Sequence, residues 1–521
     1  MSGGFRSRSG GGRPRGEQQP GKQPGKDESG KQGSGRRGGG PAKSGRPRPQ
    51  GGDRGGRPAA GQGGARRGAE KRAPRPFPGL DAPRQLAHEV LTRVREDDAY
   101  ANLILPRLLK ERKITDRDAA FTTEITYGTL RTMGVLDAVI AECSTRPLDQ
   151  IVPEVLDALR LGAYQLLYTR VEPHAAVDTT VRLVEATGNE KAKGFANAIM
   201  RTISRTPAEK WIRKLAPSGE IAAAAFRNAH PTWIAESFSR VLGLGDLDAA
   251  LGADSDRPTV HLVARPGELT AEELALMTGG EEGGYSPYAV HLGSGDPGDL
   301  EPVREGLAAV QDEGSQLIAR AVVEAPLEGE DRGRWLDLCA GPGGKAALMG
   351  ALARIDDARV DAVEVSPHRA KLVEKATRGL PVTVHVADGR DPGLEPGYDR
   401  VLVDAPCSGL GALRRRPEAR WRKSEDDIAG LSPLQYDLLA SALRLVRPGG
   451  VVVYSTCSPD LRETRSIVNR AVAELGAVEV DAHELVAPMT DVGNEKSVQM
   501  WPHRHGTDAM FFAVLRRGED R

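Results

Sequence analysis

Two cysteines and one aspartate follow short apolar runs near the C-terminal end of the chain. The run Tyr398–Gly411 contains Asp404 and Cys407, and the run Val451–Ser458 contains Cys457. Strands that are apolar on both faces are typical of a parallel sheet that helices cover. The ligand crevice of such a sheet lies outside the carboxyl ends of its strands. We therefore expect two thiols and a carboxylate to meet in one crevice.

These residue types suit methyl transfer to a pyrimidine. Carbon 5 of cytosine is a poor nucleophile, but a thiolate that adds to carbon 6 makes carbon 5 enamine-like, so that it can attack a sulfonium methyl group. The reaction needs a nucleophilic cysteine, an acid near N3 and a base for the C5 proton. A lone cysteine in a strand turn is usually a small buried hydrophobe, whereas two at neighbouring strand ends indicate catalysis. We interpret Cys143 as a core residue and Cys339 as part of a turn.

A glycine-rich segment, Asp337–Lys345, follows another apolar run and precedes a helical pattern. Glycines allow a tight turn and a close approach of the backbone to a ligand. The spacing does not match GxGxxG, and Ala346 stands where a P-loop has Ser or Thr, so a phosphate cradle is not predicted. Glu364, at the next strand end, could accept hydrogen bonds from a ribose, and Asp388 could hold an adenine edge. A nucleoside ligand without phosphates fits S-adenosylmethionine.

The elements that must position these residues follow from alternating apolar patterns. From about Val310 onward strands alternate with helices, which predicts a parallel sheet. The predicted strands are Trp335–Cys339, Val360–Val365, Val382–Val386, Arg400–Val403 and Val451–Ser455, and the predicted helices are Lys345–Leu352, Pro367–Thr377 and Pro433–Val446. Ala477–Val480 and Met510–Leu515 could add an antiparallel pair, which suits a methyltransferase sheet better than a dehydrogenase one.

The chain before the sheet has a different character. Apolar residues recur at helical spacing from Pro83 to about Thr206, which predicts an all-helical domain. Further helix with weak periodicity is expected to about Asp256, and residues 257–310 are predicted to form a small α/β unit that includes a helix capped by Thr270. Three basic residues of the helical region could face RNA, although a solvated charged surface is the simpler interpretation. They are Lys191, Lys193 and Arg201.

Charge is distributed unevenly in this chain of 521 residues. Lys and Arg number 72 and Asp and Glu number 72, yet residues 1–80 carry 19 basic and 5 acidic residues. This segment is rich in Gly, Arg, Pro, Gln and Ser and is predicted to be disordered as far as about Phe77. Its Arg-Gly character suits RNA phosphates, and a solubilising tail is the alternative. A second basic run, Arg414–Lys423, contains Trp421 and suggests backbone contacts and base stacking with a single-stranded or flipped RNA base.

The cellular setting is also constrained by composition. The four cysteines form no CxxC pair, which predicts a reduced, cytoplasmic protein without disulfides or a zinc site. We expect no membrane span, because no apolar run reaches about 18 residues. The N-terminus has no apolar segment typical of a secretory signal. We further expect a monomer.

Five motifs, LDLCAGPGGK, VEVSPHR, VADGRD, VDAPCSGLG and YSTCS, together resemble those of the RNA cytosine-5 methyltransferases of the Fmu/Sun (RsmB-like) family. Residues 83–206 are similar to the NusB-like RNA-binding domain that precedes the catalytic part in the bacterial 16S rRNA members. Val310–Leu317 also matches the segment that enters the catalytic domain in that family. The resemblance covers about residues 83–518.

The resemblance implies an α/β fold, namely a class I Rossmann-like S-adenosylmethionine methyltransferase domain preceded by an all-α NusB-like domain and a disordered basic tail. The implied divisions are a tail at 1–80, the NusB-like domain at 81–206, a connector with a small α/β subdomain at 207–309, and the methyltransferase domain at 310–518. The implied reaction is methylation of C5 of a cytosine in 16S rRNA through a covalent adduct between cysteine and C6.

Roles for individual residues follow from the same resemblance. Cys457 matches the nucleophile, Cys407 the thiol that helps to release the enzyme from its product, and Asp404 a residue that contacts both the base and the cofactor region. The implied cofactor-binding residues are Cys339, Ala340, Gly341, Pro342, Gly343, Gly344, Lys345, Glu364, Asp388 and Asp404. No metal is predicted.

The chain departs from the family pattern at two places. Glu463 is followed by Thr464 where the family commonly has Asn, and Asp508–Phe512 reads Asp-Ala-Met-Phe-Phe where Asp-Gly-Phe-Phe is expected. Neither place includes a thiol, so these departures bear on fine positioning and not on whether the chain is active.

Other functions are compatible with parts of the sequence. A non-catalytic RNA-binding assembly factor would need only the helical domain and the basic tail, and would bind RNA without methyl transfer. A tRNA-directed relative is the main rival within the enzyme class, although the NusB-like domain favours rRNA. A DNA cytosine methyltransferase would use the Pro-Cys thiol as its nucleophile and would not need Thr456-Cys457, so DNA is not an expected partner.

Overall fold

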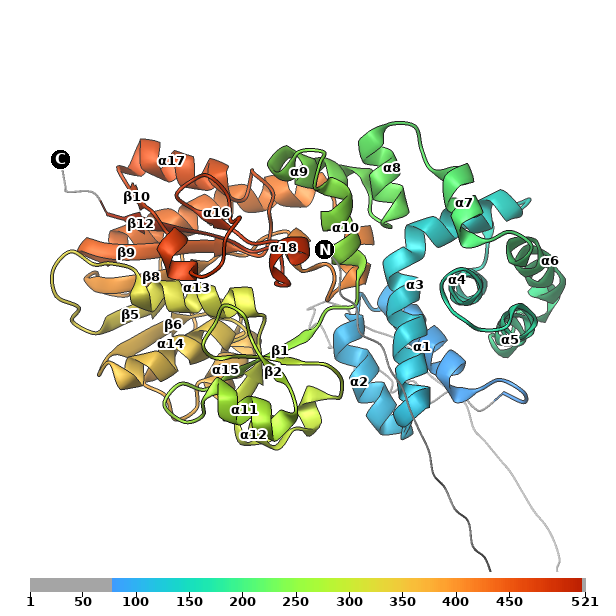
Figure 1. The fold of residues 1–521 in the computed structure, drawn as a ribbon, viewed down its shortest axis with the longest axis horizontal. Coiled ribbons are helices and arrows are strands. Elements are labelled where there is room, and N and C mark those ends of the chain that lie inside the picture. The colour runs from blue at the N-terminus through green and yellow to red at the C-terminus, as the bar shows by residue number, and fades with distance from the viewer. Residues whose placement is uncertain (1–76, 518–521) are drawn as a thin grey trace, which may run out of the picture. The chain divides into compact units, whose positions relative to one another are not determined.

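The computed structural model describes residues 77–517, and the basic segment predicted to be disordered lies almost wholly outside this range. Helices form the first part of the described chain, as predicted (Figure 1). They are α1 (Ala82–Glu96), α2 (Ala101–Arg112), α3 (Asp116–Cys143), α4 (Pro153–Tyr168), α5 (Pro173–Ala186) and α6 (Lys193–Ser204). The α1 helix begins where Asp81 accepts a hydrogen bond from the Arg84 N–H and a proline occupies the first turn. Its buried face, which includes Leu86 and Val90, joins the core of this bundle.

Four further helices connect the bundle to the sheets. They are α7 (Ala208–Leu215), α8 (Glu220–Arg227), α9 (Thr232–Leu242) and α10 (Leu247–Ser255). Phe238 of α9 packs edge-on against Trp501, with ring centroids 5.4 Å apart, in a core that also contains Leu410 and Leu413. These connecting helices therefore pack onto the chain that follows Cys407. Their apolar residues show only weak helical periodicity because the helices make contacts on more than one side.

A small antiparallel sheet with strand order β2-β3-β1-β4 follows. Its strands are β1 (Val260–Ala264), β2 (Glu281–Glu282), β3 (Ala289–Leu292) and β4 (Ala308–Val310), accompanied by α11 (Ala271–Thr278) and α12 (Glu301–Glu305). Thr270 caps α11 as predicted: its hydroxyl accepts from the Glu273 N–H, and the Glu273 carboxylate accepts from the Thr270 N–H.

The second sheet has strand order β10-β12-β9-β8-β5-β6-β7, with β11 paired to β12. Its strands are β5 (Arg334–Asp337), β6 (Arg359–Val363), β7 (Val382–His385), β8 (Tyr398–Asp404), β9 (Val446–Thr456), β10 (Val478–Val480), β11 (Val498–Gln499) and β12 (Phe511–Arg516). The strands from β9 to β7 are parallel, whereas β12 runs antiparallel to β9 and β10. The predicted parallel sheet and its antiparallel terminal pair are thus confirmed, and only the two-residue β11 was not predicted.

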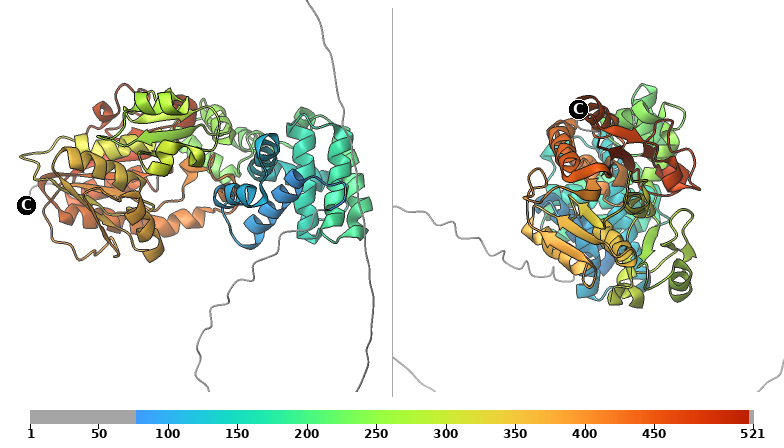
Figure 2. Two further views of the ribbon diagram at one scale, coloured as in Figure 1. Left: turned by 90° about the horizontal axis from the view of Figure 1, so that it is seen from below. Right: turned by 90° about the vertical axis from the view of Figure 1, so that its left-hand side faces the viewer.

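Helices cover both faces of this sheet (Figures 1 and 2). They are α13 (Glu313–Glu324), α14 (Gly344–Ile355), α15 (Pro367–Ala376), α16 (Glu425–Leu445) and α17 (Arg465–Leu475), and the four-residue α18 (Pro502–His505) lies in the final loop. Alternate strand residues enter two separate cores: Leu402 and Val453 join one with α13 and α14, while Val401 and Val452 join the other with α16 and α17. This explains why the strands are apolar on both faces.

One predicted helix boundary was wrong. We expected a helix to begin at Pro433, but α16 begins at Glu425 and carries Pro433 inside it. The actual start is fixed by reciprocal hydrogen bonds between Ser424 and Asp427, and the proline was mistaken for a first-turn residue. No helix in residues 77–517 combines the length and apolar character that a membrane crossing requires.

Candidate active site

The site lies where the parallel strands end. Strands β6 and β7 lie on one side of β5, and β8 and β9 lie on the other, so the strand order reverses between β5 and β8. Open α/β sheets bind ligands at such a topological switch point. Lys345, in the first turn of α14 after β5, donates from Nζ to Asp404 Oδ2 at 2.7 Å. The other oxygen of Asp404, at the end of β8, accepts from Ser455 Oγ of β9 at 3.0 Å. Asp404 is therefore tied to elements on both of its sides.

The two thiols meet beside this aspartate. Asp404 pairs in register with Ser455, and Cys457 directly follows the end of β9. Cys407 lies three residues after β8, and its Sγ is 3.3 Å from Cys457 Sγ. The hydrogen bond with Cys457, together with burial, raises the pKa of the Cys407 thiol well above its ordinary value. Cys407 is accordingly a protonated thiol at neutral pH.

A buried carboxylate that the sequence analysis did not assign to the site supports the thiol loops. Glu463 is fully buried and accepts from the Ser408 N–H at 2.8 Å and from the Ser408 hydroxyl. Gln435 of α16 donates to the same carboxylate at 3.0 Å and also to the Pro406 carbonyl oxygen at 3.0 Å. Glu463 thus holds Ser408, and Gln435, which it also binds, holds Pro406 on the other side of Cys407. The sequence places Glu463 shortly after Thr-Cys-Ser, but it does not reveal the partners of Glu463, because Ser408 and Gln435 are 55 and 28 residues away along the chain.

The loop that carries Cys407 also packs directly against the one that carries Cys457. Gly411 donates its N–H to the Cys457 carbonyl oxygen at 2.9 Å and accepts from the Ala509 N–H at 2.8 Å. A Cβ at position 411 would lie 1.9 Å from the Ala509 carbonyl oxygen. Only glycine permits this approach, so the spacing of the two thiols depends on it.

The predicted cofactor turn fits a nucleoside ligand. Residues Leu338–Gly343 lead from β5 into α14. A Cβ at Gly341 would lie 2.1 Å from Glu364 Oε2, so glycine keeps the turn close to this acid. Glu364, buried at the end of β6, accepts from the Ser366 N–H at 2.9 Å through Oε1. Within the described part of the chain, its second oxygen is held only by a 3.4 Å ion pair with Arg369, and a carboxylate oxygen of this kind is a suitable acceptor for ribose hydroxyls.

The last predicted acid, Asp388, lies beyond the end of β7 and is paired with Arg390. Hydrogen bonds from Arg390 lower the pKa of Asp388 to about 2. It is half-exposed and ionised, and it lies at the same edge of the sheet as Glu364, which follows the neighbouring strand β6. Together with Asp404 and the glycine turn, these acids give this edge of the sheet several hydrogen-bond acceptors, which suit a nucleoside better than a phosphate.

A further acid at this edge was not singled out in the sequence. Asp337 ends β5 and is buried, and its Oδ2 has no hydrogen-bond partner among the described residues. Its Oδ1 accepts from the Cys339 N–H at 3.3 Å. Burial and the nearby charge of Asp404 raise the pKa of Asp337 to about 7. Burial would lower the pKa of Lys345, but the Asp404 carboxylate outweighs it, so that pKa is raised.

Several residues of the basic run Arg414–Lys423 make contacts within the protein, while Arg416 and Arg422 are exposed and the predicted RNA contact stays a prediction. Arg414 and Arg415 both donate to the buried carboxylate of Asp508, at 2.6 and 2.9 Å, and Arg415 also donates to Asp312 at 2.7 Å. A buried pair of carboxylates requires such charge compensation. These arginines therefore hold the Cys407 loop to the C-terminal loop.

The rest of the run contacts the helical part of the chain. Arg420 is fully buried and donates to the carbonyl oxygens of Ala229 and Asp254, both at 3.0 Å. Trp421 donates from Nε1 to the Leu130 carbonyl oxygen of α3 at 2.7 Å. Arg422 donates to the Val94 carbonyl oxygen at the end of α1. The predicted base-stacking tryptophan thus makes a structural contact between the segment that follows Cys407 and the helical bundle.

Comparisons with known proteins agree with this architecture. The NusB family model matches residues 81–205, and the model described as 16S rRNA methyltransferase RsmB/F matches residues 324–516. Rv1407 of Mycobacterium tuberculosis, named as a methyltransferase without a stated substrate, is 55% identical over 452 residues, which are 86% of this chain and 98% of that protein. The ribosomal RNA small subunit methyltransferase B of Salmonella newport is 34% identical over 394 residues, which are 73% of this chain and 88% of that enzyme.

A solved structure shows the same fold. The crystal structure of PH0851 superposes with a TM-score of 0.70 at 23% identity and covers 84% of this chain and 99% of its own. The arrangement of a NusB-like helical part before a Rossmann-like sheet is therefore shared along most of the described chain. The family models and the relative at 34% identity establish that the chain belongs to the RsmB/F family of S-adenosylmethionine-dependent 16S rRNA methyltransferases.

Proposed function

We propose that this protein methylates C5 of a cytosine in 16S rRNA through a transient bond between Cys457 Sγ and C6 of the base. The observation that supports this most directly is the placement of two thiols 3.3 Å apart at adjacent strand ends, beside the Lys345–Asp404 pair. Methylation of a ring nitrogen or an exocyclic amine needs no thiol nucleophile, whereas the unreactive C5 of cytosine does.

Cys457 is assigned as the nucleophile and Cys407 as the thiol that assists release. Addition of the Cys457 thiolate to C6 shifts the electrons of the C5–C6 double bond towards C5. After C5 has been methylated, loss of its proton to a base re-forms the double bond and expels the Cys457 sulfur. Cys407, protonated because of its raised pKa, can donate a hydrogen bond to the departing sulfur.

Asp404 is assigned to the base edge at N3, with Lys345 as the proton source behind it. Negative charge develops at N3 when the thiolate adds to C6, so a proton or hydrogen bond delivered there stabilises the adduct. The 2.7 Å hydrogen bond from Lys345 allows a proton to pass through the carboxylate. The Ser455 hydroxyl keeps the other oxygen of Asp404 in place.

Residues at the neighbouring strand ends are assigned to the cofactor. Backbone from Cys339 to Lys345, with Glu364 and Asp388, would hold S-adenosylmethionine. When bound, it supplies an electrophilic methyl group. Gly341 supports this assignment, because the contact distance to Glu364 leaves no space for a side chain in the turn. Asp404 belongs to both groups, since it lies between the turn that contains Lys345 and the thiols.

The substrate is proposed to be a single-stranded or flipped cytosine, because a base within a helix could not reach sulfur atoms at the edge of a sheet. We further propose that the protein acts as a monomer in the cytoplasm. Membership of the family does not by itself establish the C5 position, the covalent adduct, the flipped base, the monomeric state or the cytoplasmic location, so these are parts of the proposal.

Three single substitutions test the proposed chemistry. Cys457→Ala should abolish methyl transfer from labelled S-adenosylmethionine, and Cys407→Ala should accumulate an adduct between protein and RNA that survives denaturing electrophoresis. Cys143→Ala, in the helical bundle, is the matched control and should behave as wild type. Bisulfite mapping of 16S rRNA should show one protected cytosine that depends on Cys457. Full activity of Cys457→Ala would refute the assignment, and RNA binding without any methyl transfer would favour an assembly factor.

A further inference from the structure

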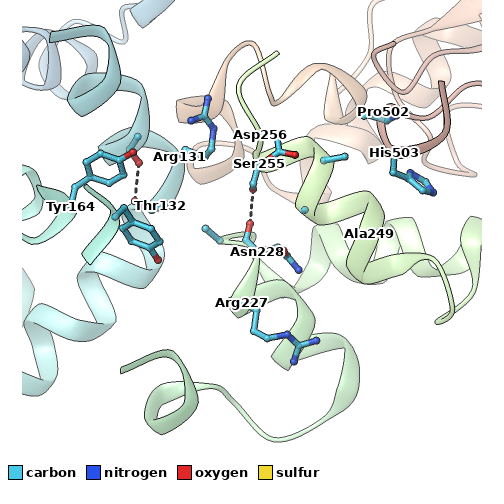
Figure 3. Close-up of a pocket in the computed structure, with 15 residues that line it drawn as sticks. Arg131, Thr132, Tyr164, Arg227, Asn228, Ala249, Ser255, Asp256, Pro502 and His503 are labelled. Carbon is cyan, nitrogen blue, oxygen red and sulfur yellow. Dashed lines mark hydrogen bonds between the residues drawn. The ribbon is translucent and has the colours of Figure 1, made fainter. Parts of the chain in front are cut away.

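A cavity whose lining includes neither thiol lies between the helical bundle and the connecting helices. Its volume is about 720 Å³, within the range of about 300–1,000 Å³ that is usual for ligand sites. Residues of α3 and α4 line one side, α8 and α10 another, and Pro502 and His503 of the C-terminal loop complete it. Figure 3 shows Tyr164 and Arg131 on one side of the pocket and His503 on the other. Parts of the chain separated by more than 300 residues therefore share one site.

Two arginines line this pocket: Arg227 of α8 pairs with Asp248 at 2.7 Å, and the other is Arg131 of α3. Its Nε is buried and has no hydrogen-bond partner, and its guanidinium forms no ion pair among residues 77–517. Burial lowers the pKa of Arg131, and this effect outweighs the opposing influence of Tyr164, Glu124, Asp254 and Asp256. A partly buried guanidinium without a partner is unfavourable in the free protein. A phosphate would satisfy it, because arginine binds phosphate oxygens through paired hydrogen bonds.

Aromatic rings lie beside this cation. Tyr164 and Tyr168 stack with centroids 5.5 Å apart and planes at 19°. The Tyr164 hydroxyl donates to Glu124 at 2.6 Å, which fixes the inner ring. Tyr168 at the end of α4 is 37% exposed, and its ring lines the cavity. An accessible ring and an arginine that line the same cavity match the way in which proteins bind single-stranded nucleic acid, with a base on the ring and a phosphate on the cation.

The opposite side of the cavity offers a neutral hydrogen-bonding group. The His503 side chain is 9% exposed, and neither ring nitrogen has a hydrogen-bond partner among the described residues. Its nearest carboxylate is Asp246, 3.8 Å from Nε2. Burial and the nearby Arg504 lower the pKa of His503, so the ring is neutral at pH 7 and can both donate and accept.

From these features we infer that the cavity binds a segment of single-stranded RNA outside the catalytic crevice. A backbone phosphate would contact Arg131, a base would stack on Tyr168, and His503 would bond a polar group at the far side. The identification of this RNA as the substrate strand rests on the proposed function. Because the pocket combines the NusB-like helices with the C-terminal loop, it would hold the strand while another nucleotide enters the crevice.

Binding of a fluorescently labelled, short single-stranded 16S rRNA fragment to the full chain tests this inference. Arg131→Gln should weaken binding about 5- to 20-fold and make the dependence of log affinity on log salt less steep by about 0.7, as expected for one lost phosphate contact. Tyr168→Leu should weaken binding at least about fivefold without changing that slope, whereas Tyr168→Phe should bind as wild type. Arg182→Gln is the matched control: it removes a cation of α5 that pairs with Asp178, and it should change affinity less than twofold.

Stability separates a ligand-binding role from a structural one. Arg131→Gln removes an unsatisfied charge, so its thermal midpoint without RNA should equal or exceed that of wild type. Unchanged RNA affinity in both Arg131→Gln and Tyr168→Leu would overturn the inference, as would a salt slope unaltered by Arg131→Gln. Cytidine 5′-monophosphate could instead bind in a way that depends on Arg131 while binding of the RNA strand does not. That result would identify a free nucleotide as the occupant and would also overturn the inference.

The outcome is independent of the proposed chemistry. If the RNA product contains no 5-methylcytosine but binding depends on Arg131 and Tyr168, the pocket is supported and the C5 proposal fails. If 5-methylcytosine forms through Cys457 and the pocket variants bind RNA normally, the C5 proposal stands and the pocket inference fails. In the supported case the pocket variants raise KM with little change in kcat, because neither residue is near the thiols.

Discussion

Replacing Asp337 with asparagine should stabilise the protein relative to wild type, and this stabilisation should be larger at pH 8 than at pH 5. Asp337 is buried at the end of β5, and burial with the charge of Asp404 raises its pKa from 3.8 to about 7. Below the unfolded value the carboxyl is protonated in both the folded and the unfolded chain. As the pH rises towards the folded value, only the unfolded chain loses the proton, so the folded state is progressively disfavoured.

The size of the effect follows from the two pKa values. A shift of about three units corresponds to about 4 kcal/mol of destabilisation once both states are ionised. At pH 5 the same values give a penalty of about 1.7 kcal/mol. The free energy of unfolding of Asp337→Asn should therefore gain about 2 to 3 kcal/mol on wild type between pH 5 and pH 8. Asparagine can still accept from the Cys339 N–H, so the backbone contact is retained.

Urea denaturation of both proteins at pH 5, 6, 7 and 8, followed by tryptophan fluorescence, measures this difference. Asp388→Asn is the matched control at the end of a nearby strand: Arg390 lowers the pKa of Asp388 to about 2, so Asp388 is ionised throughout this range. Its effect on stability should not vary with pH. A constant difference between wild type and Asp337→Asn from pH 5 to pH 8 would show that Asp337 does not titrate as inferred.

Three further predictions concern the thiols and the loop between them and the helices. Glu463→Gln should lower kcat about tenfold or more while leaving KM near wild type, because it weakens the support of Ser408 beside Cys407; unchanged kcat would contradict that role. Trp421→Ala should destabilise the protein by about 2 to 3 kcal/mol and increase proteolysis between the helical and catalytic parts, since it removes the contact with α3; an unaltered urea midpoint would count against it. Dilute hydrogen peroxide should oxidise the Cys407 and Cys457 thiols to a disulfide, with reduction of the peroxide to water, because their sulfurs are 3.3 Å apart. Mass spectrometry should then show the loss of two hydrogens and dithiothreitol should restore activity, whereas loss of activity without this bond would contradict the prediction.

The sheet could be predicted because its strands are recorded directly in the sequence as apolar runs. Val401 and Leu402 enter cores on opposite faces, which is why adjacent positions are both apolar. Parallel strands end at one edge, so the proximity of Cys407 and Cys457 followed from their positions after two such runs. The catalytic and cofactor roles of these residues, and the domain divisions at residues 206 and 309, stay predictions.

The support of the site could not be predicted in the same way. Glu463 holds Ser408 across 55 residues, and Asp508 neutralises Arg414 across 94. The sequence shows which groups are charged but not which distant groups of opposite charge they meet. The composition of the basic run therefore predicts an RNA surface, although three of its arginines, Arg414, Arg415 and Arg420, are held by Asp312, Asp508 and backbone carbonyls. Asp337 was passed over because its unusual pKa arises from burial, which follows only from the fold.

The course of the chain from Cys407 to Trp421 limits how far the protein can be treated as separable modules. Only 13 residues lie between Cys407 and Trp421, whose indole contacts α3, and Arg420, within that stretch, is fully buried against the connecting helices. Cutting away the helical bundle would leave this indole and the Arg422 guanidinium without the partners that α3 and α1 provide. A transplanted catalytic half would therefore need its loop redesigned before it could keep its sulfur atoms in place.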